Sequence, residues 1–400
     1  MKVLFAESHN LDRPDPLGSH HYIRLFKEAG HDCLWLGPAL SPMHIGKPDQ
    51  LNRHRYRIWR EGGCEIDGIR WLVPLTLIFY YNRPFMRSLY AGRNQYRFCL
   101  PPLAGQLQKI GFAEVDLLWC AGPAALSLLD IIPHRVSCYR LADRLDQFAM
   151  IPPSVGIIQQ ELIAGVDFVL ASSLDLREWA LESGGKEVYY LPNGVSDSFF
   201  SACRQKPEDF PAGKRPTAVY LGSIDTRFDL KPLAAAVKRL PEVNFLLIGP
   251  LAEVRLKGEI AGLQKKENFR WLGPKEYKTA PAYLQHGAVG LIPFHDSRLT
   301  AAVNPIKYYE YLASGLPVVA PPLRELMAMK GPLHAYRAGD EEDFCRAVRE
   351  ALAGNEKEGE AGRQKRIKFA SGQNWRARFT TITEILEKKG LPKSFVNRQG

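Results

Sequence analysis

Short runs of apolar and β-branched residues alternate with segments of helical periodicity along the whole chain. This alternation is typical of parallel βαβ units, and it argues against a β-sandwich or a helical bundle. The sequence therefore predicts an α/β protein. The predicted strands are Lys2–Ser8, Asp32–Gly37, Ile69–Pro74, Asp116–Cys120, Val136–Leu141, Asp167–Ala171 and Val188–Leu191, followed by Ala218–Gly222, Asn244–Gly249, Phe269–Gly273, Ala288–Pro293, Pro317–Ala320 and His334–Tyr336.

These strands form two groups, separated by a stretch without periodic pattern. From residue 192 to residue 216, proline, glycine and charged residues replace the alternation, which is typical of a linker. We therefore expect two Rossmann-like, doubly wound domains. The expected parts are an N-terminal domain in residues 1–191, a linker in 192–216, a C-terminal domain in 217–360 and a helical segment in 361–400.

The last predicted helix, Asn374–Lys388, is amphipathic. Its apolar residues Trp375, Phe379, Ile382 and Leu386 are spaced by four, three and four positions, which places them in one stripe along the helix. We expect this stripe to brace the N-terminal domain.

Composition and charge narrow the class of protein. Of the 400 residues, 46% are hydrophobic and 24% are charged, which suits two folded cores and excludes a disordered or fibrous chain. The net charge of +10 indicates a face that attracts phosphates, nucleic acid or anionic lipid. No run reaches the roughly 18 apolar residues of a membrane span. We expect a cytoplasmic protein, or one that is peripheral on the inner face of the membrane.

Several catalytic signatures are absent from the sequence. The loop after the first strand reads HNLDRPDPLGSHH and lacks GxGxxG, and GxxxxGK[ST], HExxH and GxSxG occur nowhere. The seven cysteines are scattered without a CxxC pair. We therefore expect neither a metal nor an organic cofactor.

The strongest local signal is the run AVNPIKYYEYLASGLPVVA at Ala302–Ala320, which predicts a helix followed by a buried strand. Asn304 is a good N-cap, Pro305 fits the first helical position, and Gly315 is expected to end the helix. The free N–H groups and the positive dipole end at the start of the helix suit a diphosphate.

Two charged residues follow this predicted helix start. Lys307 adds a positive charge, and Glu310 lies three residues later, where it could accept hydrogen bonds from ribose hydroxyls. The alternative is an ordinary surface ion pair between Lys307 and Glu310.

The same run, VNPIKYYEYLASGLPVVA, resembles the nucleotide-sugar signature in the C-terminal domain of GT-B glycosyltransferases. The resemblance is strongest to the family 4-like enzymes of teichuronic-acid and exopolysaccharide synthesis. Further segments agree with it over about residues 165–325. They are VDFVLASSLDLREWALESGG with VYYLPNGVSDSFF, YLGSIDTRFDLKPL with VNFLLIGP, and WLGPKEYKTAPAYLQHGAVGLIPF.

The resemblance implies a cleft between the two domains, with a nucleoside diphosphate sugar, expected to be a UDP-sugar, held mainly by the C-terminal domain. By position, Asn304, Lys307 and Glu310 become donor-binding residues. Ser223 and Arg227 lie where the loop of this family approaches the donor diphosphate. The alternative for Arg227 is an ordinary surface position. Because these groups would neutralise the diphosphate, no metal is needed.

The sequence departs from the family at Ala302, which replaces the first Glu of the E-x7-E motif, while Glu310 stands at the second. The missing carboxylate favours inverting transfer, in which a base deprotonates the acceptor hydroxyl. Asp143, after the strand Val136–Leu141, is the expected base, because a similar place holds the proposed base of xanthan-type glucuronosyltransferases. Its alternatives are a capping role or pairing with Arg140 or Arg144.

The loop PLGSHH offers further acceptor-binding residues. Gly18 permits close backbone approach, and His20 or His21 could contact the acceptor or act as base. The alternative is a solvent-exposed histidine pair.

Basic and aromatic residues are interleaved between Gly68 and Ala113, where no Asp or Glu occurs. This pattern suits an interface with an anionic bilayer. The alternative is a solvated basic face with aromatic residues in the core, and no recognised module supports nucleic-acid binding. The residues are Arg70, Arg83, Arg87, Arg93, Arg97 and Lys109 with Trp71, Phe79, Tyr80, Tyr81, Phe85, Tyr90, Tyr96 and Phe98, extended upstream by Arg53, Arg55, Arg57 and Arg60.

Together these observations predict a hexosyl- or glucuronosyltransferase that moves a sugar from a nucleoside diphosphate to a glycan acceptor in surface polysaccharide synthesis. The acceptor is expected to be lipid-linked and the protein to contact anionic membrane. Two alternatives remain: an isomerase of the UDP-sugar 2-epimerase type, and a non-catalytic nucleotide-sugar-binding paralogue.

Overall fold

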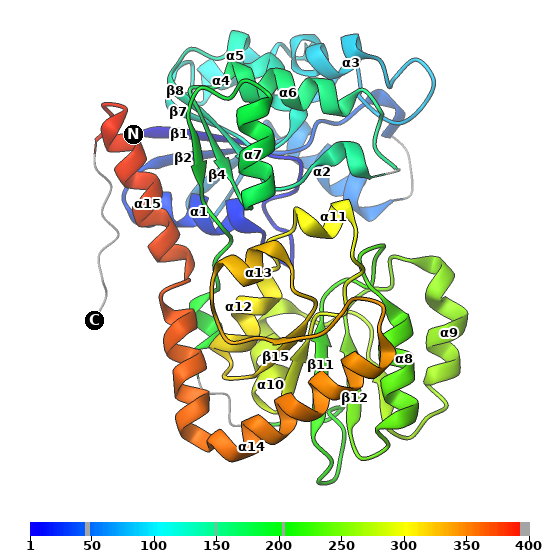
Figure 1. Ribbon diagram of the computed structural model, residues 1–400. Coiled ribbons are helices and arrows are strands. Elements are labelled where there is room, and N and C mark those ends of the chain that lie inside the picture. Colours follow the sequence, from blue (N-terminus) through cyan, green and yellow to red (C-terminus); the bar gives the residue numbers. More distant parts are fainter. Residues whose placement is uncertain (45–48, 149, 202–204, 393–400) are drawn as a thin grey trace. The chain divides into compact units, whose positions relative to one another are not determined.

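The computed structural model describes residues 1–44, 49–148, 150–201 and 205–392. These residues form two compact units (Figure 1). The first unit holds Met1–Pro192 and the described residues from Arg378 on, and the second holds Asn193–Ala377. Six cysteines are free thiols, and Cys203 lies outside the described residues.

The first unit is built on an eight-stranded sheet with the strand order β10-β9-β8-β7-β1-β2-β4-β3. All neighbouring strands are parallel except β3 and β4. The strands are β1 (Lys2–Ala6), β2 (Asp32–Leu36), β3 (Cys64–Ile66), β4 (Ile69–Leu72), β7 (Val115–Cys120), β8 (His134–Leu141), β9 (Phe168–Ala171) and β10 (Val188–Tyr190), with β5 (Leu75–Thr76) and β6 (Cys99–Leu100) as a separate antiparallel pair.

The sequence did not predict strand β3. Asp67 and Gly68 both have positive φ angles, 52° and 72°, and they connect β3 to β4 as the two central residues of a tight hairpin turn. Three residues are too few to show an alternating pattern, so only the Asp-Gly pair signals this hairpin.

Helices follow most strands of the first unit. The helices are α1 (Gly18–Glu28), α2 (Gln50–Arg60), α3 (Leu89–Asn94), α4 (Leu103–Lys109), α5 (Leu128–Ile131), α6 (Val155–Gly165) and α7 (Leu174–Glu182), and the C-terminal helix is α15 (Trp375–Lys388). Phe379 of α15 packs edge-on against Phe26 of α1, with ring centroids 4.8 Å apart. Farther along, Lys389 forms an ion pair with Glu187.

The second unit contains a six-stranded, fully parallel sheet with the order β13-β12-β11-β14-β15-β16. Its strands are β11 (Thr217–Leu221), β12 (Asn244–Ile248), β13 (Phe269–Trp271), β14 (Val289–Leu291), β15 (Val318–Ala320) and β16 (His334–Ala335). The predicted α/β class with two doubly wound sheets is confirmed. The cleft predicted between the two domains stays a prediction.

The helices of the second unit are α8 (Leu230–Arg239), α9 (Lys257–Leu263), α10 (Ala280–Gln285), α11 (Arg298–Ala301), α12 (Ile306–Ala313), α13 (Arg324–Ala328) and α14 (Glu341–Ser371). Helix α14 packs against α8 and α12, and its backbone is kinked at Gly359, where φ is 53°. Helix α12 ends as predicted, because Gly315 follows it with a φ angle of 84°.

Each sheet has one point at which the chain direction across the sheet reverses. In the first unit β1 lies between β2 and β7, and in the second unit β11 lies between β12 and β14. Ligands of open parallel sheets bind beyond the carboxyl ends of the strands at such a switch point. The loops after β1 and β11 are therefore the places to examine for binding residues.

We expect the Phe26–Phe379 contact to stabilise the first unit. Phe379 is buried, so Phe379→Ala should lower the free energy of unfolding by about 3 to 5 kcal/mol, as core Phe→Ala changes do. Urea denaturation measures this change. Glu384→Ala, at an exposed position of the same helix, is the control and should change stability by less than about 0.5 kcal/mol. Equal effects of the two variants would contradict a packing role for α15.

Candidate functional site

Two loops meet at the switch point of the second sheet, one after β11 and one after β14. The backbone N–H of His295 donates to the carbonyl of Arg227 over 2.9 Å, and the N–H of Asp229 donates to the carbonyl of Pro293 over 2.7 Å. These bonds fix the loop that carries Arg227 against the carboxyl end of β14.

Lys307, in the first turn of α12, points its ammonium toward the junction of the loops that follow β11 and β14. The Nζ atom lies 5.1 Å from the ring centroid of Tyr220 and 5.3 Å from that of Phe294. Burial and, to a smaller extent, the charge of Arg227 lower the pKa of Lys307 to about 8, although Asp225 and Glu310 oppose the shift. The ammonium is therefore a buried cation whose charged form is destabilised mainly by the loss of water.

Glycine is required beside this ammonium. Gly222 has a φ angle of 140°, and a Cβ atom added to it would lie 2.7 Å from the Nζ of Lys307. Gly249, also at φ 140°, packs closely against Gly222. A Cβ atom added to Gly249 would lie 2.0 Å from the carbonyl oxygen of Gly222. Bare backbone at Gly222 thus lies against the ammonium, and Gly249 lets the loop after β12 pack against Gly222.

Arg227 is held by a carboxylate that the sequence analysis did not single out. Its Nε and NH2 groups donate to Asp225 over 3.0 and 2.5 Å, in the bidentate geometry typical of Arg–carboxylate pairs. Burial would raise the pKa of Asp225, but the hydrogen bonds from Arg227 outweigh it and hold this pKa below its usual value. Asp225 therefore orients the guanidinium next to Lys307 and neutralises part of its charge.

Glu310 lies one helical turn from Lys307 and is buried. The hydroxyl of Tyr277 donates a hydrogen bond to its Oε1 atom over 2.8 Å. Burial raises the pKa of Glu310, although the bond from Tyr277 and the charge of Lys307 oppose the shift. Tyr277 precedes Glu310 by 33 positions, so no local pattern in the sequence could have paired them.

The prediction that Asn304 caps α12 is wrong. The N-cap is Pro305, and the helix begins at Ile306. The side chain of Asn304 is buried and its Oδ1 accepts from the N–H of Asn193 and from the hydroxyl of Tyr309, each over 3.1 Å. Its Nδ2 donates to Glu325 over 3.1 Å. Asn304 thus fixes the start of the second unit to α12, and this network uses the polar atoms that a cap would need.

The remaining positions on the second unit are Ser223 and Ala302. Ser223 follows Gly222 in the loop after β11, and its carbonyl accepts from the hydroxyl of Tyr220 over 2.6 Å, which fixes this part of the loop. Ala302 is buried at the end of α11. The structure thus brings Arg227, Lys307 and Glu310 into one electrostatic cluster, with Ser223 in the adjoining loop.

On the first unit, Asp143 lies at the carboxyl end of β8 and is partly exposed. Its carbonyl accepts from Nε2 of Gln159 over 3.1 Å, so the backbone at this position is fixed. Of the two alternatives, Arg144 pairs with Asp146 at 2.7 Å, whereas Arg140 is attracted electrostatically by Asp143.

His20 is a structural residue in this state of the molecule. It is fully buried, its Nδ1 accepts from the N–H of Leu17 over 3.2 Å, and its Nε2 must therefore carry the proton that it shares with the carbonyl of Asn10 at 2.9 Å. Both nitrogens are engaged, so the expectation that His20 could act as base fails for this arrangement.

The neighbours of His20 are placed differently. Gly18 is the first residue of α1. His21 is partly buried, and burial together with the charge of Arg24 lowers the pKa of His21 to about 3. A neutral His21 at the start of α1 can accept or donate a hydrogen bond without charge, and so it stays a candidate contact for the acceptor.

Glu7 is a further candidate residue that no sequence motif marks. This residue directly follows β1 at the switch point of the first sheet, and its buried Oε1 has no hydrogen-bond partner among the described residues. Burial raises the pKa of Glu7 to about 7, against the opposing effects of hydrogen bonds from Ser19 and Ser8. A charged residue at the end of an apolar strand was the available signal.

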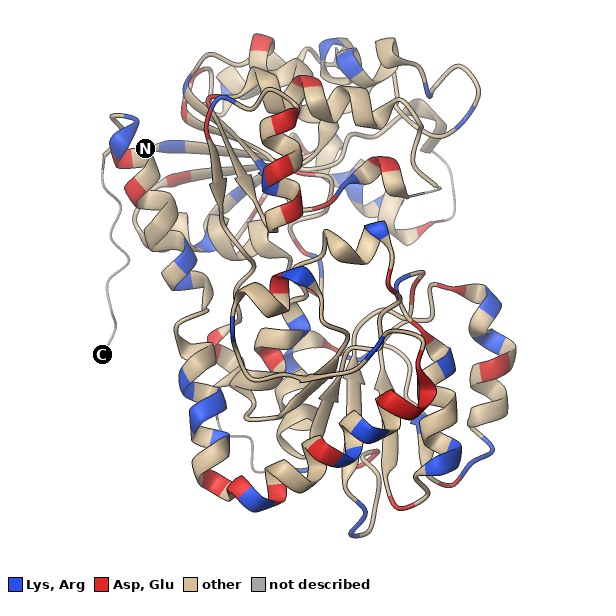
Figure 2. Cartoon of the chain, viewed as in Figure 1, with Lys and Arg blue, Asp and Glu red and all other residues tan. Residues whose placement is uncertain are grey.

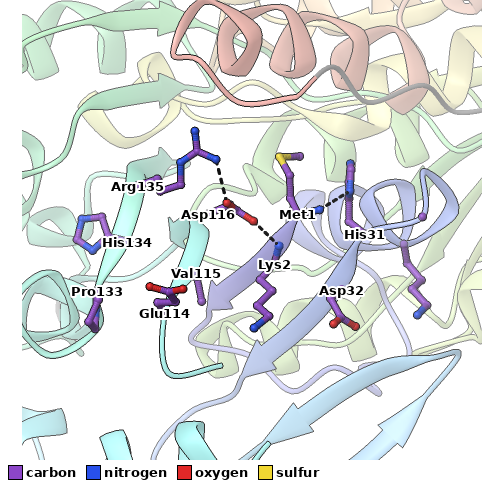
Figure 3. Close-up of a pocket in the computed structure, with 12 residues that line it drawn as sticks. Met1, Lys2, His31, Asp32, Glu114, Val115, Asp116, Pro133, His134 and Arg135 are labelled. Atoms are coloured by element: carbon purple, nitrogen blue, oxygen red, sulfur yellow. Dashed lines mark hydrogen bonds and ion pairs between the residues drawn. The ribbon is translucent and has the colours of Figure 1, made fainter. Parts of the chain in front are cut away.

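A hollow of about 740 Å³ lies at the opposite, amino-terminal edge of the first sheet (Figure 3). Asp116 is the acceptor of two bonds in its lining. Asp116 accepts from the backbone N–H of Lys2 over 2.8 Å and from Arg135 over 3.2 Å. The hollow contains none of the residues that the sequence singled out.

Two other features have no candidate among the described residues: a metal site and a membrane-spanning helix. Within the described ranges, no group of three His, Cys, Asp or Glu side chains is arranged to hold a metal ion. In the same part of the chain, every helix is too short or too polar to cross a membrane.

The C-terminal domain is similar to a known protein family. Residues 215–354 match the family model of glycosyl transferases group 1. A curated relative named as a teichuronic acid biosynthesis glycosyltransferase, TuaH of Bacillus subtilis (strain 168), is 31% identical over 219 residues. This alignment covers 53% of this chain and 53% of the relative, so the chain spans about half the length of the curated relative that it matches.

Solved structures match over nearly the whole chain. Sucrose-phosphate synthase from Thermosynechococcus elongatus has a TM-score of 0.72 at 13% identity, covering 97% of this chain and 98% of that one. HepE of Anabaena in complex with UDP has a TM-score of 0.64 at 14% identity, covering 97% and 100%. The fold is GT-B, as predicted, and the resemblance to family 4-like glycosyltransferases is confirmed.

The buried carboxyl group of Glu7 should make stability depend on pH. Because folding raises its pKa from 4.5 to about 7, the folded protein binds this proton more tightly than the unfolded chain. The stability that this difference provides is fully present below pH 4.5 and is lost as the pH rises through about 7. The loss amounts to about 1.4 kcal/mol for each pKa unit of the shift.

Urea denaturation across this pH range, with Glu7→Gln as the comparison, measures the effect. The variant cannot ionise at position 7, so its free energy of unfolding should fall less than that of the unaltered chain between pH 5 and pH 7. Parallel curves for the two proteins would show that Glu7 is not the titrating group.

Proposed function

We propose that this chain, a GT-B protein whose residues 215–354 match glycosyl transferases group 1, transfers a sugar from a UDP-sugar to a glycan acceptor. The second unit would bind the donor and the first the acceptor. TuaH, named for teichuronic acid biosynthesis, supports a role in surface polysaccharide synthesis.

The observation that carries this proposal is the convergence of two cations, Lys307 and Arg227, at the carboxyl edge of the second sheet. A buried ammonium with a pKa lowered to about 8 and an arginine neutralised by one carboxylate together favour a ligand with more than one negative charge. A nucleoside diphosphate supplies that negative charge. It would bind at the carboxyl edge of the sheet, at the switch point, where open parallel sheets bind their ligands. The HepE complex with UDP supports uridine as the nucleoside.

The same cluster contains a group suited to ribose. Glu310 is fixed by Tyr277 at 2.8 Å, and a carboxylate held in this way accepts hydrogen bonds from vicinal hydroxyls with little loss of side-chain entropy. Ser223, in the loop beside Gly222, would donate to a phosphate oxygen. Asn304 would act by fixing the start of α12, because its side chain is bonded to Asn193 and Glu325.

In the proposed reaction, the carboxylate of Asp143 takes the proton of the acceptor hydroxyl. The hydroxyl oxygen then forms a bond to the anomeric carbon while the bond from that carbon to the diphosphate breaks, which inverts the configuration. UDP leaves with the bonding electron pair, and Lys307 and Arg227 stabilise the charge that develops on it. Gly18 and His21, at the start of α1, would contact the acceptor.

We propose that the acceptor glycan is linked to a lipid. It would bring the chain to the cytoplasmic face of a membrane as a peripheral protein. The excess of positive charge over the whole chain, +10, favours contact with anionic lipid.

The second candidate is a nucleotide-sugar-binding protein without turnover, which is favoured by Ala302. This buried alanine leaves no carboxylate where the E-x7-E motif has its first. Such a protein would gain thermal stability from UDP-sugars and release no UDP with any acceptor. An isomerase of the UDP-sugar 2-epimerase type would instead change the donor sugar without an acceptor.

We expect UDP to raise the melting temperature of the protein, because a ligand that binds only the native state stabilises it. Lys307→Met removes the ammonium and should slow sugar transfer by roughly 10²-fold. In the unaltered protein, UDP affinity should fall as the pH rises above about 8, since Lys307 then loses its proton. Titration calorimetry at several pH values measures this loss.

The control for charge is Lys238→Met, which removes an exposed lysine of α8. It should leave UDP affinity and its pH dependence unchanged. If Lys307→Met bound UDP as tightly as the unaltered protein, the proposal that the diphosphate binds beside Lys307 would be wrong.

Asp143→Asn should reduce kcat by roughly 10²-fold or more without changing UDP affinity, because the amide cannot accept the acceptor's proton. Asp146→Asn is the matched control on the same loop, and it should retain most of the activity. Equal rates of the Asp143 variant and the unaltered protein would exclude Asp143 as the base.

A further inference from the structure

The segment Leu77–Tyr90 presents apolar side chains to solvent on the first unit. The side chain of Phe85 is 98% exposed, that of Tyr90 59%, that of Leu77 56% and that of Tyr81 50%. Four large apolar or aromatic side chains exposed within fourteen residues are a concentration that surfaces of soluble proteins keep for binding. We call this stretch the 77–90 segment.

The structure divides the aromatic residues of the predicted basic region into two sets. Trp71 and Tyr96 are buried in the core of the unit, so they are unavailable for binding. The most exposed aromatic residues, Phe85, Tyr90 and Tyr81, lie in the 77–90 segment, which forms the projecting loop beside α3 in Figure 1, whereas Phe98 outside it is 38% exposed.

The arginines divide in the same way. Arg93 pairs with Glu161 and Arg97 pairs with Asp130, and Arg70 donates to the carbonyl of Ile110 over 2.5 Å. Arg83 and Arg87 are exposed, and within the described residues neither forms an ion pair. Since no Asp or Glu occurs from residue 68 to residue 113, the projecting loop shows basic and no acidic colour in Figure 2.

The backbone holds Phe85 in an unfavourable conformation. Its φ angle is 67°, which costs free energy for a bulky residue. The turn is nevertheless defined, because the N–H of Met86 donates to the carbonyl of Arg83 over 3.1 Å and the N–H of Tyr81 donates to the carbonyl of Met86 over 3.2 Å. A strained turn therefore directs an aromatic ring into water.

The 77–90 segment is also anchored to the rest of the unit. The hydroxyl of Ser154 donates to the carbonyl of Arg87 over 2.7 Å and shares a hydrogen bond of 2.8 Å with the hydroxyl of Tyr80. Both ends of the turn are thus attached near the start of α6. The exposed ring and its two flanking cations are presented on a fixed support, which lowers the entropy lost on binding.

We propose that the 77–90 segment binds the surface of an anionic bilayer. The ring of Phe85 enters the boundary between headgroups and acyl chains, and Arg83 and Arg87 bind lipid phosphates. Aromatic rings suit this boundary, and the absence of acidic residues removes repulsion from the lipid charge. This inference rests on the proposed function for its reason to approach a membrane, the lipid-linked acceptor.

Vesicle flotation of the full chain tests the proposal. The probes are phosphatidylcholine vesicles with and without phosphatidylglycerol. We expect binding to the vesicles that contain phosphatidylglycerol and a steep loss of binding with added salt. Phe85→Ser should weaken this binding about tenfold, because the variant loses the burial of one aromatic side chain in the bilayer. The double variant Arg83→Gln/Arg87→Gln should weaken it roughly tenfold or more.

Matched controls come from the second unit. Val254→Ser removes a 72% exposed apolar side chain, and Lys265→Gln/Lys266→Gln removes two exposed charges. Both controls should float like the unaltered chain. Because every altered side chain is exposed, thermal unfolding should stay unchanged and exclude misfolding as a cause.

Three results would overturn the proposal: equal flotation with both vesicle types, flotation that neither the Phe85 nor the arginine variant weakens, and binding to single-stranded RNA without binding to vesicles. UDP-induced stabilisation, measured on the same samples, keeps the two proposals apart. Its presence without flotation rejects the membrane contact alone, and its absence with flotation rejects the donor site alone.

Discussion

The ammonium of Lys307 lies between the rings of Tyr220 and Phe294 at the carboxyl edge of the second sheet. Placing a cation there costs free energy, and the lowered pKa of Lys307 records that cost. The surrounding structure accommodates the cation through backbone without side chains at Gly222, aromatic faces, and two carboxylates that are each bonded to another group. A bound polyanion would further stabilise the ammonium and the neighbouring guanidinium of Arg227, and the proposed donor site rests on this attraction.

The fold could be predicted because its signal is repeated along the chain. Each buried parallel strand is a short apolar run, and every predicted run became a strand. The strands that were missed, β3, β5 and β6, have two or three residues and pair antiparallel, so neither burial on both faces nor alternation marks them. In the site, by contrast, Tyr277 meets Glu310 only through the tertiary structure.

Local rules misled the sequence analysis where a polar side chain had a distant partner. Asn304 precedes a proline and a helix, which is the ordinary pattern of a cap, yet its amide bonds Asn193 and Glu325. His20 looks like an exposed histidine in a polar loop, but its two nitrogens fix the chain between Asn10 and Leu17. In both cases the buried polar side chain already forms its hydrogen bonds within the protein, so it is not available to bind a ligand.

The contact of Gly249 with the carbonyl of Gly222 has a consequence for how this chain could change its donor. A β-carbon at Gly249 would meet the backbone of Gly222, and a β-carbon at Gly222 would meet the ammonium of Lys307, so a side chain at either position would displace the loop or the lysine. In the proposed donor site, differences in nucleotide or sugar preference would then arise at other positions, where a side chain is already present. Gly222 and Gly249 are therefore the positions of the proposed site at which an added side chain is tolerated least.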